Sequence, residues 1–495
     1  MWQMMPPGCP NDAKRGFMST VSRRDFTRFL ALSGTAALVP RTATAHEFES
    51  FAAISRELGP LPRTPREPDE AYWQSVRARF LIPRDVGFLN AANLCPMSLP
   101  VLEAIEKNAR SYELNPSPDA RSPLLHARED ARGLLAEALR VTTEELVLTR
   151  NTTEGNNFVS SGLTLGADDE VIVSSDNHPS NLNAWRQKAS RFGFTVVTVA
   201  PPPSHPGAQG YVDLFATGFT PRTKVLAVTY VSSNSGDMLP VAELCAFARE
   251  KNVLSLVDGA QAFGVLDVDL SKVKPDFFTG SMHKWPCGPK EKGVLFVNKA
   301  VHDRIAPSIY GVYGGAVGIS KTFEAEGQRD DAAIAAVVDA LKFQGGIGRA
   351  VIEQRARALA THLMTSLQRL NGVKLWTDPS PDRSAAIAIF KPGNLDPRRL
   401  GEALAKNEKV VVTSRAANGS NPGLRAAPHF YNDGRHRSLR RRDPKVHDER
   451  RMSWWRVRPQ KVKFQSLGLS LPEATCTDES QEFPSPSSPR PSRRR

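Results

Sequence analysis

Long hydrophobic runs and clusters of cysteine are both missing from this chain. The apolar stretch Phe29–Val39 has eleven residues, whereas a membrane-spanning helix needs about 20, and no other segment approaches that length. The five cysteines lie far apart, at positions 9, 95, 245, 287 and 476. Their scatter leaves no readable disulfide framework, and we expect no metal site. Cys245 lies on the apolar face of a predicted helix and is expected in the core.

The composition is ordinary for a soluble globular enzyme, and the excess charge lies at the two ends of the chain. Hydrophobic residues make up 40% and charged residues 24% of 495 residues, a length that suggests two to three domains. The net charge is +13, but residues 1–45 hold six Lys and Arg against two Asp and Glu, and residues 433–495 hold sixteen against eight. The middle is therefore close to neutral, and we expect no nucleic-acid partner.

Residues 1–45 have the features of an export signal. A twin-arginine pattern, Ser22-Arg23-Arg24-Asp25-Phe26, precedes the apolar stretch Phe29–Val39 and the small residues Ala43-Thr44-Ala45. This order of charged, apolar and small-residue regions predicts a twin-arginine signal peptide, with Met18 as a possible start. The alternative is a short amphipathic helix. We therefore expect recognition by the twin-arginine export machinery and a periplasmic location.

Short apolar runs alternate with helical patterns between residues 86 and 300. The strand-like runs are Leu146–Thr149, Glu170–Ser174, Thr195–Ala200, Lys224–Tyr230, Val253–Val257, Asp276–Thr279 and Gly293–Val297. The helical patterns between them include Pro123–Leu139, Glu154–Gly162, Ser180–Phe192 and Val241–Glu250. This alternation predicts an α/β fold whose large domain has a mostly parallel, doubly wound sheet of seven strands.

The pattern changes after residue 300, which predicts a smaller α+β domain over residues 301–432. Its expected elements are a long helical region Asp331–Leu370, strands Ala385–Phe390 and Val410–Ser414, and a helix at Pro397–Ala405. Residues 46–85 are predicted to form an N-terminal arm. The segment Pro60–Pro83 within it is rich in Pro, Arg and Glu, which favours an arm rather than core.

The regular pattern ends after Asn432. Residues 433–495 combine Arg clusters, Trp454-Trp455 and a Pro, Ser and Arg-rich end without a sustained helical or strand period. Two interpretations stay open. The segment is either a basic disordered tail that binds an acidic partner, or a translated frameshift that replaces a native final helix.

Asp258 and Lys284 stand at the ends of two strand-like runs. Asp258 closes Val253–Val257, and Lys284 follows Asp276–Thr279. The carboxyl ends of parallel strands meet at one edge of a sheet, so both side chains can reach one ligand. An acid and an amine placed this way suit pyridoxal 5′-phosphate (PLP), because the lysine can form a Schiff base with the aldehyde and the acid can keep the pyridine nitrogen protonated. Taken singly, each residue is more often a helix cap or a solvated charge.

The motif Ser281-x-His283-Lys284-Trp285 precedes Gly288-Pro289 and follows Asp258-x-x-Gln261. Together these segments resemble the class V aminotransferase family of fold-type I PLP enzymes. Within it, the chain is similar to the isopenicillin N epimerase-like and cysteine desulfurase-like branch over residues 86–432. The resemblance implies a large PLP-binding domain at 86–300, a small C-terminal domain, a homodimer, and catalysis on an amino acid or related amine.

The segment Asn151-Thr152-Thr153-Glu154-Gly155 follows a strand and begins a helix. A helix N-terminus presents unpaired N–H groups and the positive end of the helix dipole, which together bind phosphate. The hydroxyl groups of Thr152 and Thr153 add donors, although a plain N-cap is the alternative. The resemblance implies that Ser281 and His283 complete the phosphate site from the opposite side.

Four further residues have roles that the resemblance implies. His178 matches the histidine that stacks on the cofactor ring and assists proton transfer. Asn234 and Gln261 match residues that hydrogen-bond the cofactor's phenolic oxygen. Arg425 matches the arginine that binds a substrate carboxylate with its planar fork of donors.

The resemblance also implies the course of the reaction. The substrate amine displaces Lys284 from the cofactor, and the freed lysine removes the Cα proton. Epimerisation or transamination is favoured, and the alternatives are a PLP-binding pseudoenzyme or a C–S lyase without a persulfide cysteine. No cysteine lies between Cys287 and Cys476, where cysteine desulfurases place their nucleophile, and Gln328 stands where the family has a phosphate-binding threonine.

Overall fold

The computed structural model describes residues 50–415 and 421–432. The predicted signal peptide at 1–45 and the basic segment at 433–495 lie outside the described residues. The chain divides after Glu57 into two units. The short helix α2 (Phe51–Leu58) spans this division, and all that follows concerns the unit that begins at Leu58.

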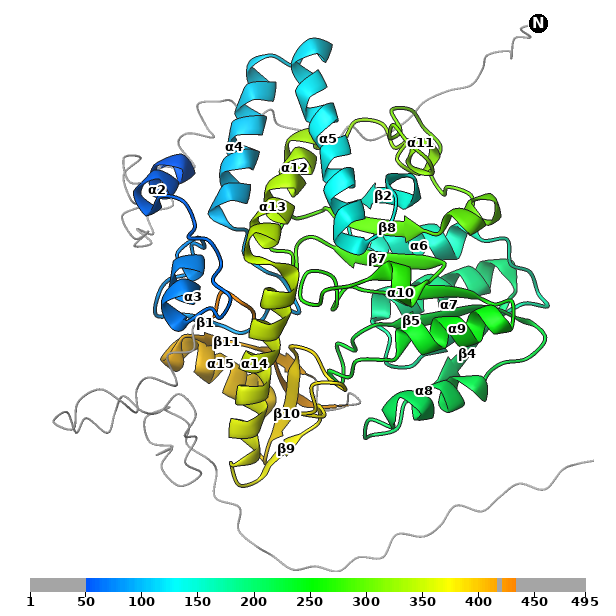
Figure 1. Ribbon diagram of the computed structural model, residues 1–495. Coiled ribbons are helices and arrows are strands. Elements are labelled where there is room, and N and C mark those ends of the chain that lie inside the picture. The colour runs from blue at the N-terminus through cyan, green and yellow to red at the C-terminus, as the bar shows by residue number, and fades with distance from the viewer. Residues whose placement is uncertain (1–49, 416–420, 433–495) are drawn as a thin grey trace, which may run out of the picture. The chain divides into compact units, whose positions relative to one another are not determined.

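A seven-stranded sheet forms the centre of the large domain, as predicted (Figure 1). Its strands, in spatial order, are β2 (Leu146–Thr149), β8 (Gly293–Val297), β7 (Phe277–Ser281), β6 (Leu254–Asp258), β5 (Thr223–Thr229), β3 (Glu170–Ser174) and β4 (Thr195–Val199). Only β8 runs opposite to the other six. The carboxyl ends of those six strands therefore lie along one edge of the sheet.

The central strands form because their apolar runs are covered on both faces. Every residue of β3, β6, β7 and β8 is buried, as expected for parallel strands between two helical layers. The helices of these layers are α5 (Pro118–Leu139), α6 (Thr152–Gly162), α7 (Pro179–Phe192), α8 (Gly207–Ala216), α9 (Val241–Glu250) and α10 (Leu270–Val273), whereas α4 (Leu99–Leu114) packs against α5. Cys245 is buried on α9, as expected.

A second sheet has the antiparallel order β12-β13-β10-β9. Its strands are β9 (Val373–Leu375), β10 (Ala388–Pro392), β12 (Thr413–Arg415) and β13 (Gly423–Ala426), and helices α14 (Arg349–Gln368) and α15 (Pro397–Glu408) pack against it. A short parallel pair, β1 (Gly87–Phe88) with β11 (Val410–Val411), joins this region to the start of the large domain. The short helix α11 (Ser320–Phe323) lies between the last strand of the large sheet and the helices that lead to the second sheet.

The helical region predicted at Asp331–Leu370 is three helices rather than one. These are α12 (Asp331–Ala335), α13 (Val337–Ile347) and α14. The break between α13 and α14 falls at Gly348, whose φ of 96° is accessible to glycine at little cost. A glycine with positive φ ends one helix and lets the next leave in a new direction.

The expectation that Pro60–Pro83 lies outside the core is wrong. Helix α3 (Glu70–Arg77) begins there, where the Asp69 carboxylate accepts a hydrogen bond from Tyr72 N at 2.9 Å. Tyr72, Trp73 and Val76 are buried in the main hydrophobic core. The prediction missed these three core positions because charged residues and prolines surround the short helix in the sequence.

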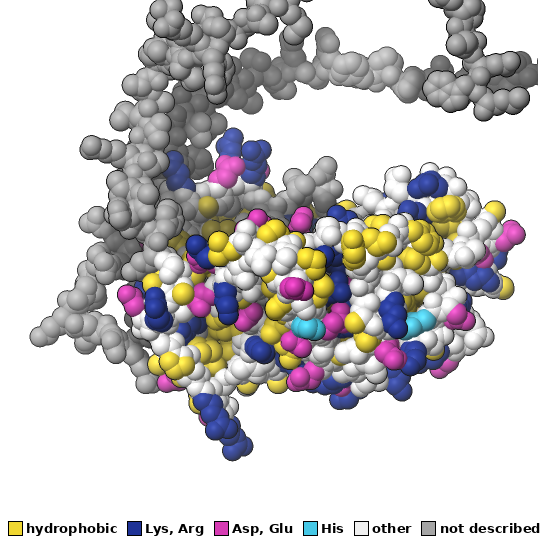
Figure 2. Space-filling model, turned by 90° about the horizontal axis from the view of Figure 1, so that it is seen from above, with side chains coloured by type: hydrophobic (Ala, Val, Ile, Leu, Met, Phe, Trp, Pro, Cys, Tyr) yellow, Lys and Arg dark blue, Asp and Glu magenta, His cyan; other side chains and the backbone are white. Residues whose placement is uncertain are grey.

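Acidic and basic side chains alternate over the face shown in Figure 2, without a large area of one sign. This mixture agrees with the near-neutral charge of the central part of the chain. Within residues 50–415 and 421–432, none of the helices combines the length and apolarity needed to cross a bilayer.

Candidate active site

The predicted site residues gather at the carboxyl-terminal edge of the central sheet. They follow or end five different strands, so the parallel arrangement brings together segments that are far apart in sequence. Thr152 and Thr153 follow β2, His178 follows β3, Asn234 follows β5, Asp258 ends β6, and Ser281, His283 and Lys284 end or follow β7.

Asp258 is a buried carboxylate with amide partners. It is 2% exposed, and its Oδ2 accepts hydrogen bonds from Asn156 Nδ2 at 2.9 Å and Asn181 Nδ2 at 3.5 Å. Its Oδ1 accepts from Ala260 N at 3.1 Å. Among the described residues, it forms no ion pair. A buried charge in this position calls for a cationic or N–H ligand.

Gly259 allows the Asp258 turn to lie close against β7. A Cβ atom at this position would lie 2.1 Å from Phe278 Cζ, a distance that no side chain can accept. Gly259 N instead donates to Thr279 O at 2.8 Å. This close contact fixes the position of Asp258 relative to the strand that precedes Lys284.

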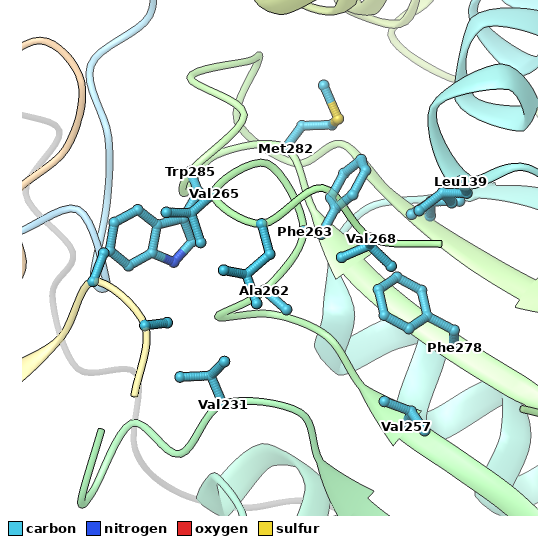
Figure 3. Close-up of a cluster of buried hydrophobic side chains, with 14 of the residues drawn as sticks. Leu139, Val231, Val257, Ala262, Phe263, Val265, Val268, Phe278, Met282 and Trp285 are labelled. Carbon is cyan, nitrogen blue, oxygen red and sulfur yellow. The ribbon is translucent and has the colours of Figure 1, made fainter. Parts of the chain in front are cut away.

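Lys284 is held between two anchored neighbours. Met282 and Trp285 belong to the apolar cluster drawn in Figure 3, and Trp285 Nε1 donates to Gln261 Oε1 at 2.9 Å. The Lys284 carbonyl accepts from Cys287 N at 3.0 Å. The backbone around the lysine is therefore rigid, whereas its amine is not bonded to any of the described side chains.

Burial lowers the pKa of the Lys284 amine from 10.5 to about 8. The nearby Asp258 carboxylate acts in the opposite direction, and Arg425 adds to the lowering. A lysine with such a pKa has a substantial neutral fraction near physiological pH. The neutral amine is a nucleophile towards aldehydes and a base towards a carbon acid.

The rate at which the cofactor-free protein takes up PLP is expected to rise with pH around a midpoint near 8. Below that pH the Lys284 amine is protonated and has no lone pair to attack the aldehyde, and above it the amine is neutral. Rapid-mixing absorbance measurements from pH 6.5 to 10 check this. Asp258→Asn removes an anion that raises the pKa, so its midpoint moves to lower pH. A wild-type midpoint at 10.5 contradicts the prediction.

The N-terminus of α6 carries the residues predicted to bind the phosphate. Asn151 caps α6 by accepting from Glu154 N at 3.1 Å. Thr152 N donates to Ser281 Oγ at 2.9 Å, and the two hydroxyl oxygens lie 2.7 Å apart. The structure thus brings Thr152 and Ser281 together as predicted, while the Thr153 side chain is exposed at the mouth.

His283 and His178 are both more easily deprotonated than ordinary histidines. Burial, followed by the Lys284 cation, lowers the pKa of His283 to about 4. The same two causes, in the same order, lower the pKa of His178. His178 Nδ1 accepts from Ser180 N at 3.2 Å, so the neutral ring carries its proton on Nε2. Both imidazoles are neutral at pH 7.

Asn234 and Gln261 already contact protein groups through their side-chain amides. Asn234 Nδ2 donates to Asp176 O at 3.1 Å, and its Oδ1 accepts from Arg415 Nη2 at 2.7 Å. Gln261 Nε2 donates to Ala92 O at 2.8 Å, and Gln261 Oε1 accepts from the Trp285 indole. One amide hydrogen of each remains, so their roles at the phenolic oxygen stay predictions.

Arg425 is a buried cation without a partner. It lies in β13, is 8% exposed, and its Nε has no hydrogen-bond acceptor. No other residue of the described chain accepts a hydrogen bond from its guanidinium or forms an ion pair with it. Burial, followed by the nearby Arg415, lowers its pKa to about 10. The unused fork of donors fits a carboxylate ligand.

The profile of the family described as Aminotransferase class-V matches residues 89–429. The chain belongs to the class-V aminotransferase family. It is 28% identical over 380 residues to isopenicillin N epimerase from Streptomyces clavuligerus, covering 73% of this chain and 94% of that protein. It is 26% identical over 383 residues to a probable cysteine desulfurase from Methanothermobacter thermautotrophicus, covering 72% and 94%.

Solved structures show the same fold. A C-DES variant with glycine covalently linked to its PLP cofactor has a TM-score of 0.68 at 23% identity, covering 76% of this chain and 99% of that one. The cysteine desulfurase from Thermococcus onnurineus has a TM-score of 0.67 at 22% identity, covering 76% and 97%. The architecture is that of fold-type I PLP enzymes, and PLP is the cofactor of this class-V aminotransferase-like enzyme.

The residues present fit this cofactor, because Asp258 and Lys284 form no ion pair within the described chain and so remain available to its charges. The Asp258 carboxylate suits a protonated ring nitrogen, and the Lys284 amine suits the aldehyde. Thr152 and Ser281 meet at the N-terminus of α6, which suits a phosphate, so the phosphate roles predicted for them, for Thr153 and for His283 remain predictions. His178 is the residue available for the ring face.

Three contributors to the site were missed in the sequence. Asn156 and Asn181 orient Asp258, and Arg415 borders Asn234. Asn156 is four residues after Thr152 on α6, so the helical period could have placed it on the same face. Nothing local in the sequence singles out Asn181 or Arg415.

Proposed function

We propose that this enzyme acts on an amino acid or a related amine by moving the proton at its Cα, with epimerisation or transamination as the outcome. The observation that carries the proposal is the pairing of a low-pKa amine, Lys284, with an unpartnered buried guanidinium, Arg425. An amine of this kind is a base at neutral pH, and the guanidinium holds the carboxylate that neighbours the reacting carbon.

Bound PLP supplies an electron sink for the negative charge that forms at the substrate Cα. Arg425 orients the substrate through its carboxylate, and Lys284 Nζ receives the Cα proton. Asp258 holds a proton on the ring nitrogen, while Asn156 and Asn181 keep its carboxylate in place. Return of the proton to the opposite face of the same carbon inverts the amino acid, and return elsewhere transfers the amino group.

Exchange of the Cα proton with solvent tests this proposal directly. PLP-loaded protein is incubated with a panel of amino acids in D₂O, and deuterium at Cα is measured by mass spectrometry and NMR. Both outcomes require exchange by the wild type and its loss in Lys284→Ala. A panel without any exchange, visible spectral change or inversion refutes the proposal and favours a PLP-binding protein without turnover.

The protein is expected not to release sulfide and alanine from cysteine through a persulfide. That route needs an accessible thiolate. The Cys287 thiol is 1% exposed, donates to Trp285 O at 3.6 Å, and contacts the Cys95 thiol. Burial raises its pKa well above the ordinary value. Incubation with cysteine and a reductant, followed by sulfide and alanine assays, checks this; sulfide release that disappears in Cys287→Ser contradicts it.

We also propose that the enzyme works as an exported homodimer. The twin-arginine pattern supports export. Exposed apolar side chains at Ile309, Tyr310, Val312 and Tyr313 support a partner surface, and Ile309 lines a pocket together with Asn151 and Thr153 at the start of α6. Light scattering of the purified protein and fractionation of expressing cells test the two parts. A monomer, or a cytoplasmic protein, refutes the corresponding part.

A further inference from the structure

Two arginines share one face of the antiparallel pair β12–β13. Thr413 lies directly opposite Arg425, and Arg415 lies opposite Gly423. Because alternate residues of a strand face the same side, Arg415 and Arg425 are diagonal neighbours on one face. Such neighbours are about 7–8 Å apart at their backbones. The register therefore places a second guanidinium next to the one that fits a substrate carboxylate.

Neither arginine is neutralised within the described part of the chain. Arg425 has no hydrogen-bond acceptor at all there. Arg415 is half-buried and donates only to neutral oxygens: Nη1 to Ser233 O at 3.1 Å, Nη2 to Asn234 Oδ1 at 2.7 Å, and Nε to Asn421 O at 3.2 Å. These three bonds use three of the five N–H groups of a guanidinium, so one remains on each terminal nitrogen.

Electrostatic interactions link Lys284 to Arg425, and Arg425 to Arg415. Arg425 lowers the pKa of both Lys284 and His178, and Arg415 in turn lowers the pKa of Arg425. Asp176 is the acid that acts on Arg415. Its Oδ2 is occupied by the hydroxyl groups of Ser232 and Ser235, and it forms no ion pair with Arg415 among the described residues. Arg415 reaches the predicted site residue Asn234 through Nη2, so two adjacent positive charges lie beside the substrate region.

We propose that the substrate is a dicarboxylic amino acid, or one with an equivalent second anionic group, and that Arg415 binds this distal group while Arg425 binds the α-carboxylate. The inference rests on the proposed function and names its substrate class. Adjacent cations repel each other unless an anion is shared or each has its own. Because Arg415 and Arg425 are diagonal neighbours, the two carboxylates of one short substrate can each meet a guanidinium of its own.

An alternative role for Arg415 is to brace the 232–236 loop through Ser233 and Asn234. The two roles differ in what they predict for ligand binding. A brace affects every ligand of the site to a similar degree. If Arg415 instead binds a second carboxylate, its loss weakens the binding of dicarboxylates, while the binding of monocarboxylates stays as it is in the wild type.

Calorimetric binding of glutarate and butyrate to the PLP-loaded protein distinguishes these roles without any turnover. The wild type is expected to bind glutarate more tightly than butyrate by about 30-fold, because loss of one member of a buried charge pair costs at least this factor. In Arg415→Gln the ratio of the two dissociation constants falls towards one, and Arg415→Lys restores part of it. The dissociation constants of succinate and adipate, which are one carbon shorter and one carbon longer than glutarate, show which chain length binds most tightly.

Arg357→Gln is the matched control. Arg357 also bonds neutral backbone oxygens, Pro381 O at 2.6 Å and Ser384 O, and it pairs with Glu353 rather than with a residue of the site. In Arg357→Gln, the ratio of the dissociation constants for butyrate and glutarate is expected to equal that of the wild type. Equal binding of glutarate and butyrate by the wild type overturns the inference, and so does a parallel loss of both ligands, or an unchanged ratio, in Arg415→Gln. Failure of Cα exchange with preserved selectivity for glutarate instead refutes the proposed function alone.

Discussion

Lys284→Ala is expected to lower turnover by about four orders of magnitude, the upper range for loss of a general base. The variant lacks both the amine that bonds the cofactor and the base that receives the Cα proton. Single-turnover absorbance measurements with a reactive amino acid give the rate of the chemical step.

Two further measurements separate this effect from misfolding. Lys272→Ala is the control, since the Lys272 side chain on α10 is 83% exposed and its loss is expected to leave the rate within about twofold, as for most surface substitutions. Borohydride reduction of the wild type followed by peptide mapping is expected to leave the pyridoxyl group on Lys284. Label on another lysine disproves the assignment.

Asp258→Asn is expected to retain PLP and to lower turnover by about 1000-fold, which corresponds to about 4 kcal/mol of transition-state stabilisation. Asparagine has nearly the same shape and can still accept from Asn156 and Asn181, but it has no charge to keep the ring nitrogen protonated. The fold and the phosphate end of the site do not depend on that charge. Steady-state kinetics together with the visible spectrum measure the two effects separately.

Asp276→Asn is the matched control for that variant. Asp276 accepts hydrogen bonds from the Ser255 amide and hydroxyl at 2.7 and 2.9 Å, near the opposite ends of the same two strands. Its substitution is expected to affect stability and to leave the turnover of the folded protein unchanged. If Asp258→Asn keeps more than about a tenth of the wild-type rate, a loss of less than about 1.4 kcal/mol, the electron-sink role of Asp258 is wrong.

Strands and motif positions could be predicted from the sequence because they depend on local patterns. The runs at 146–149, 170–174 and 293–297 match β2, β3 and β8 to the residue. A buried strand needs a short continuous apolar run, and such runs are visible without any knowledge of their neighbours. Placing Asp258 and Lys284 at the carboxyl ends of two such strands then predicted that they belong to one site.

Helix breaks and small helices were less predictable. The region Asp331–Leu370 has helical character throughout, and only its packing made Gly348 a break rather than a tolerated interior glycine. Helix α3 was hidden because its three buried residues are surrounded by Pro, Arg and Glu. A short amphipathic helix is stabilised mainly by the core that receives its apolar face, and that core is assembled from distant segments.

By itself, the sequence determined the fold class, the order of the strands along the chain, and the lysine and aspartate of the site, since each depends on neighbouring residues. Tertiary structure alone decided how those groups are tuned. Burial sets the pKa of Lys284, the amides of Asn156 and Asn181 reach Asp258 from two helices, and the register of β12 against β13 sets Arg415 beside Arg425. Solvation and distance act between segments remote in sequence, so they exist only once the chain has folded.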